Sequence, residues 1–119
     1  MASDAAEALR HRLRADIKAA MQARDAAETR LLRALLAAID NAQAVPLEPA
    51  DQSALPNHFD QGASEVPRLA LTETALHAVL AAEIAERERA ADDIARHGRL
   101  DDAARLRAEA VVVRRYVSP

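Results

Sequence analysis

The sequence predicts an all-α fold in which four helices form two antiparallel hairpins, joined by a long proline-rich loop over residues 44–71. Alanine supplies 31 of the 119 residues and aromatic residues only 2 %, a composition that favours helices over strands. Apolar residues recur every three or four positions in four stretches, as in helices with one buried face. Four of the five prolines lie in the loop, where they exclude a continuous helix.

The first hairpin is predicted from two helices, over residues 4–22 and 26–43. The larger apolar residues of the first helix lie four positions apart, at Leu9, Leu13, Ile17 and Met21. A single helix across both segments would be about 60 Å long, which is too long for a domain of this size. We therefore expect a break near Arg24 and Asp25, where Asp25 and Glu28 have the spacing of a capping box.

The second hairpin is predicted from two helices over residues 72–97 and 101–116. Thr72 has the residue type of an N-cap and precedes the first apolar position of its helix. Gly98 follows that helix where a left-handed residue is needed, and glycine adopts this conformation without steric cost. Asp101 is then expected to cap the fourth helix, so that a tight turn joins the two helices.

The composition excludes several classes of protein. The formal net charge is −3, from 16 basic and 19 acidic residues, which gives no overall attraction to nucleic acid or to acidic membranes. The absence of cysteine excludes disulfides, thiolate catalysis and cysteine-ligated zinc. The longest strongly apolar run covers only residues 34–39 and cannot span a bilayer. We expect a cytoplasmic protein with no membrane contact and a single domain over residues 1–119.

No pattern of residues indicates catalysis, a cofactor or a metal ion. The four histidines lack the spacing of di-iron or zincin sites, and no phosphate-binding or nucleophile motif is present. Oppositely charged residues recur four positions apart, as at Glu83 and Arg87, at Asp92 and Arg96, and at Asp101 and Arg105. This spacing is typical of a solvated helix face with ion pairs.

The end of the chain carries the candidate binding residues. A set of arginines forms a candidate RNA-contact surface, with an ordinary solvated surface as the alternative; its members are Arg99, Arg105, Arg107, Arg114 and Arg115. Apolar residues surround most of the last helix, which suggests that something covers more than one side. The candidate docking residues are Val111, Val112 and Tyr116. Packing within the chain, a second copy and another protein remain alternatives for what covers them.

Two segments, residues 14–43 and 78–119, resemble the GatB/YqeY family of small bacterial proteins. The glycine–arginine pair at the second turn falls at the family's spacing, as do three later residues, Ala103, Glu109 and Tyr116. The resemblance implies an all-helical fold and kinship with the tail of the B subunit of the glutamine-dependent amidotransferase that converts misacylated tRNA. It also implies an association with carbon–nitrogen ligase activity, in which glutamine is the amido donor, but no catalytic residue carries over.

The chain departs from this family in three ways. Residues 46–68 do not match it, and Ile94 stands where the family usually has an aromatic residue. The third difference is that longer members continue past the tyrosine into a second small helical domain, whereas this sequence ends at residue 119.

We therefore expect a non-catalytic helical adaptor that associates with tRNA or with a protein of the tRNA-amidation machinery. The alternative is a module for protein interaction or self-association with no role in RNA binding. An amidotransferase-linked enzyme in its own right is a third and weaker hypothesis.

Overall fold

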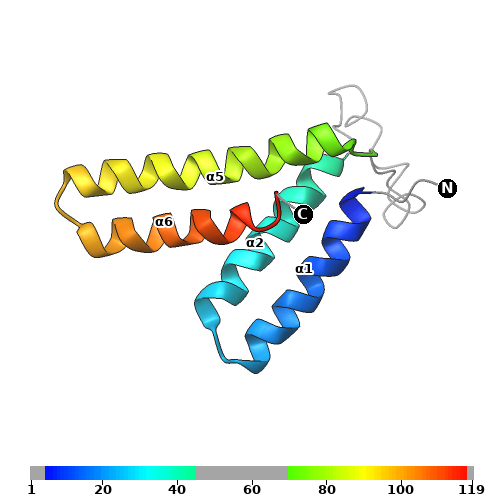
Figure 1. Ribbon diagram of the computed structural model, residues 1–119, viewed down its shortest axis with the longest axis horizontal. Helices are drawn as coiled ribbons and strands as arrows, with labels where there is room; N and C mark the ends of the chain where they lie inside the picture. The colour runs from blue at the N-terminus through cyan, green and yellow to red at the C-terminus, as the bar shows by residue number, and fades with distance from the viewer. Residues whose placement is uncertain (1–4, 45–69, 118–119) are drawn as a thin grey trace, which may run out of the picture.

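The computed structural model describes residues 5–44 and 70–117, and this part of the chain is all-α. Its helices are α1 (Ala5–Gln22), α2 (Ala26–Gln43), α5 (Glu73–Arg96) and α6 (Leu100–Arg114). The predicted fold class, with two antiparallel hairpins, is confirmed (Figure 1). Most of the predicted loop 44–71 lies outside the described residues.

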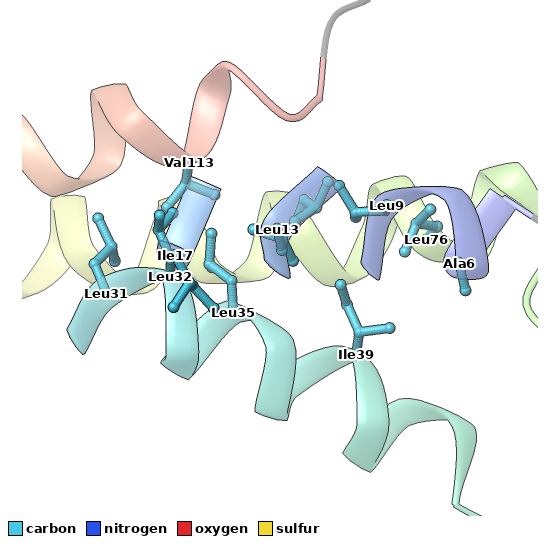
Figure 2. Packing of buried hydrophobic residues seen from close by; sticks show 11 residues of the cluster. Ala6, Leu9, Leu13, Ile17, Leu31, Leu32, Leu35, Ile39, Leu76 and Val113 are labelled. Atoms are coloured by element: carbon cyan, nitrogen blue, oxygen red, sulfur yellow. The ribbon is translucent and has the colours of Figure 1, made fainter. Parts of the chain in front are cut away.

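The two hairpins lie at an angle to each other, so that their turns point in different directions (Figure 1). Helix α5 packs against α2 and α1 as well as against α6. The hairpins share one hydrophobic core, which is drawn mainly from α1 and α2 (Figure 2). Its largest fully buried side chains are Leu13, Leu32, Leu35, Ile39, Leu80 and Val113. Each such side chain stabilises the fold by about 1.5–3 kcal/mol through burial alone.

No residue from 85 to 110 belongs to this shared core. That segment, which we call the arm, extends away from α1 and α2 (Figure 1). Alanine fills the contact between its two helices, where Ala91, Ala103 and Ala110 are buried. The small alanine side chains allow α5 and α6 to pack closely, and the larger Arg87 side chain crosses between the two helices to Glu109.

Local signals place the helix ends almost as predicted. The Asp25 carboxylate accepts a hydrogen bond from the backbone N–H of Glu28 at 3.0 Å, but the backbone N–H of Asp25 donates to the carbonyl of Ala20 at 2.9 Å. The capping box is therefore formed in one direction only. The hydroxyl of Thr72 accepts from the backbone N–H of Ala75 at 3.0 Å, as an N-cap should.

For the second turn, the predicted glycine is confirmed and the predicted helix cap is wrong. Gly98 has a φ of +82° and ends α5 as predicted. Helix α6 begins at Leu100, so Asp101 lies inside its first turn, and Arg99 occupies the cap position without a side-chain capping bond. The turn is tighter than predicted, because the backbone N–H of Leu100 already donates to the carbonyl of Gly98 at 3.0 Å.

Two residues of the first hairpin differ from expectation. Met21 was predicted on the buried face of α1 but is 53 % exposed, since α1 ends at Gln22 and the chain turns back there. Arg10 is buried instead. Its Nε donates to Asp40 at 2.8 Å and its Nη1 donates to Glu7 at 3.0 Å. This pairing allows a charged side chain to be buried between α1 and α2.

Candidate functional site

Four of the five candidate RNA-contact arginines form ion pairs with carboxylates of the same chain. Arg99 and Arg105 both contact Asp102, at 2.6 Å and 3.1 Å. Arg107 contacts Asp92 at 3.0 Å, and Arg114 pairs with Glu88. The positive charge that sequence reasoning placed on α6 is therefore largely balanced by acidic residues of α5 and of α6 itself.

These ion pairs are exposed, so each is worth about 0–1 kcal/mol and can be exchanged for a pair with an external anion. Arg115 is exposed, and within the described ranges its side chain has no carboxylate partner. Of the five arginines it is the one whose charge is most available to a ligand.

Ion pairs across the arm fix the register of α5 against α6. Arg87 donates from Nη1 to Glu83 on its own helix at 2.8 Å and from Nε to Glu109 on α6 at 3.2 Å. The predicted pair of Glu83 with Arg87 is thus confirmed. The predicted partners of Arg96 and Arg105 are wrong, because these arginines pair with Asp93 and Asp102, three positions away instead of four.

Two of the three candidate docking residues pack against their own chain. Val112 and Tyr116 lie partly buried against the shared core, whereas Val111 is 54 % exposed. The Tyr116 hydroxyl donates to Asp16 on α1 at 2.6 Å. The guanidinium of Arg12 lies 4.4 Å from the centre of the Tyr116 ring and donates to the backbone carbonyl of Arg115 at 3.1 Å. These contacts fasten the end of α6 to α1.

The pKa of Tyr116 is raised, first by burial and then by its hydrogen bond to the Asp16 carboxylate, while Arg12 opposes the change. Below the ordinary tyrosine pKa of about 10, the folded and unfolded chains both hold the phenolic proton. Above it, the unfolded chain releases the proton first, so stability falls as the pH rises toward the folded value.

We expect the tyrosinate absorbance of the folded protein to appear at a higher pH than that of the urea-unfolded chain. The measurement is clean, because the sequence has one tyrosine and no tryptophan. Asp16→Asn is expected to lower the pH at the midpoint of this titration in the folded protein, because it removes the negative charge that faces the hydroxyl. Identical midpoints for folded and unfolded protein would contradict the contact between Tyr116 and Asp16.

A second group of cations, which the sequence reasoning missed, surrounds the turn between α1 and α2. Arg24, Arg30 and Arg33 line a shallow depression together with Met21, Asp25, Ala26 and Thr29. An Nη2 atom of Arg33 lies 3.5 Å from the sulfur of Met21 across this depression. The three arginines come from the turn and from one face of α2. They are six and three residues apart in the sequence. Their grouping could not be predicted from this spacing, because Arg24 lies in the turn and not on α2.

The histidines do not gather with acidic residues. In residues 5–44 and 70–117, no three histidine, aspartate or glutamate side chains lie close enough together to hold a metal ion. His97 bonds through Nδ1 to the carbonyl of Asp93 at 2.9 Å, and His11 and His77 are exposed. His58 lies outside the described residues. Over the described segments, no helix has the length and apolarity needed to cross a bilayer.

Comparisons with protein-family models, with curated proteins and with solved structures gave no match to this chain.

Proposed function

We propose that this chain is a non-catalytic helical adaptor that binds tRNA or a protein of the tRNA-amidation machinery. The observation that carries the proposal is the arm, which extends beyond the shared core and presents the outer faces of two helices (Figure 1). The largely buried pair of Arg87 with Glu109 crosses between the two helices. Any carbon–nitrogen ligase activity would belong to the partner, with this chain serving to bind and position.

The choice of partner rests on the resemblance of residues 14–43 and 78–119 to the GatB/YqeY family. In this chain, the residues that carry the resemblance have structural roles. Ala103 is buried between the arm helices, Glu109 accepts from Arg87, and Tyr116 bonds to Asp16. A likeness made of such residues supports kinship in fold.

Binding of bulk tRNA over a series of salt concentrations tests the proposal. We expect binding at low salt that weakens steeply as salt rises, because phosphate contacts release counterions. The double variant Arg107→Glu/Arg114→Glu is expected to bind more weakly. The double variant Asp92→Asn/Glu88→Gln frees the same two arginines and is expected to bind more tightly.

Two results would count against this function. A wild-type protein that binds neither tRNA nor a purified tRNA-amidation protein would contradict the adaptor role. Equal tRNA affinity in both double variants and the wild type would remove the α6 face as the contact surface.

Exposed apolar residues on α6 favour a second candidate function, self-association or binding to another protein without RNA. Leu100 is 66 % exposed at the turn, and Val111 is more than half exposed near the other end of the helix. Sedimentation over a range of protein and salt concentrations tests this candidate. Apolar association should persist at high salt and should be lost in Val111→Asp. A monomer at every concentration would contradict self-association.

A further inference from the structure

The cations around the α1–α2 turn differ from those of the arm in having no ion-pair partner within residues 5–44 and 70–117. Among the described residues, Arg24, Arg30 and Arg33 form no ion pair with a carboxylate, whereas most arginines of the arm do. Arg14 and Lys18 are exposed and also unpaired in this part of the chain. Since residues 14, 18 and 21 share one face of a helix, these two cations extend the charged surface along α1 from the depression.

Of the nearby acidic residues, Asp25 and Asp16 accept hydrogen bonds, and Glu28, which does not line the depression, acts electrostatically on Tyr116. Asp25 is the one carboxylate among the residues that line the depression, and it caps α2 by accepting from Glu28. Asp16 accepts from Tyr116, on the flank of α1 that meets α6. Because salt screens exposed charges beyond about 8–10 Å, a ligand at the turn experiences this local excess of positive charge more than the net charge of −3.

The depression is lined by both apolar and charged side chains. Met21 is exposed there, and the guanidinium of Arg33 lies against its sulfur. Guanidinium groups bind phosphate oxygens through two parallel hydrogen bonds, and the flexible thioether of methionine adapts to apolar surfaces. A nucleotide has the matching chemistry, with an anionic phosphate beside an apolar base and sugar.

Arg24 has an unusual backbone conformation for an arginine. Its φ is +59°, in the left-handed region, which is unfavourable for a residue that bears a side chain. Glycine, which this chain uses at the other turn, would close the α1–α2 turn at lower cost. The arginine therefore carries a conformational penalty at a position from which it lines the depression together with Arg30 and Arg33.

We propose that the cationic depression, formed by Arg24, Arg30, Arg33 and Met21, binds the phosphodiester backbone of a nucleic acid. The phosphate backbone supplies closely spaced negative charges, one per nucleotide, to match three guanidiniums. Binding depends little on base sequence, because phosphate contacts carry no sequence information. The inference concerns a surface separate from the α6 face and holds whether or not tRNA is the partner of that face.

Fluorescence anisotropy with labelled single-stranded RNA and DNA of mixed sequence, together with bulk tRNA, tests the proposal over a salt series. The test variant is Arg30→Gln/Arg33→Gln, which keeps good helix formers in α2. We expect affinity to fall about tenfold or more at low salt. The slope of log affinity against log salt should fall by about 1.4, since each lost phosphate contact removes roughly 0.7 for single strands.

Arg24→Gly is a second test variant, because it removes a guanidinium and relieves the backbone penalty. It should bind less tightly while unfolding at a higher urea concentration, a combination that a purely structural role would not give. The matched control is Arg89→Gln/Arg96→Gln, which makes the same charge change on exposed positions of α5. Because both positions lie on the arm, this variant should weaken binding of the short single strands much less than Arg30→Gln/Arg33→Gln does, with unchanged helical circular dichroism in all variants.

Three outcomes overturn the proposal: no binding of any nucleic acid, equal losses in the test and control variants, or equal competition by poly-glutamate and RNA. Loss of tRNA binding in the Arg107/Arg114 variant alone would overturn this inference and leave the proposed function standing. Binding of short RNA through Arg30 and Arg33, without binding of tRNA, would support the inference and count against a tRNA adaptor. Preference for RNA over DNA would identify which nucleic acid supplies the backbone.

Discussion

Replacing Leu35 with alanine is expected to lower the free energy of unfolding by about 2–5 kcal/mol. Leu35 is fully buried in the core that joins the two hairpins, among leucines and isoleucines of α1 and α2 (Figure 2). The substitution removes apolar burial and leaves a cavity that close-packed neighbours cannot fill. Because small domains are stable by only about 5–15 kcal/mol, the loss is a large part of the total.

Urea unfolding followed by circular dichroism measures this effect. Leu100→Ala is the matched control, because it makes the same chemical change at a side chain that is mostly exposed. It should change the free energy of unfolding by no more than about 0.5 kcal/mol. Similar losses for the two variants would show that Leu35 does not lie in the core described above.

Replacing Ala103 with leucine is expected to destabilise the arm by about 1–3 kcal/mol. Ala103 is fully buried where α5 and α6 pack closely together. A leucine there would force the two helices apart and would weaken the cross-helix pairs of Arg87 with Glu109 and of Arg107 with Asp92. The shared core lies outside the arm, so the effect should be local.

Hydrogen exchange resolved along the chain measures this local effect. Protection should fall in residues 85–110 of Ala103→Leu and persist in α1 and α2. Ala104→Leu serves as the control, since it places the same side chain one position away on the exposed face of α6. Uniform loss of protection over the whole chain would contradict an arm that is separate from the core.

The helices and most of their ends could be predicted because their signals are local. Asp25, Thr72 and Gly98 each act on backbone groups within a few residues, and each acts as the sequence predicts or nearly so. Asp101 was misplaced because the cap falls two residues earlier, at Arg99, directly after Gly98. A difference of one or two residues at a helix end is beyond what residue preferences specify.

The surfaces could not be predicted because they depend on how the hairpins pack. Arg107 and Arg114 looked available in the sequence, but the register of α6 against α5 brings Asp92 and Glu88 to them. The same packing left Arg30 and Arg33 without carboxylate partners in the described part of the chain and grouped them at the turn. Spacing along one helix indicates which residues share a face, but not which charges of a neighbouring helix will meet that face.

The alanine contact between α5 and α6 affects how a partner could hold the arm. Two helices packed so closely form a narrow hairpin, and many residues on its outer faces are exposed in the part of the chain that the structure describes. A partner with two binding surfaces can therefore contact the arm on both sides at the same time. It would gain more contact area per residue than on a broad globular face, and no rearrangement of the leucine-rich body would be required.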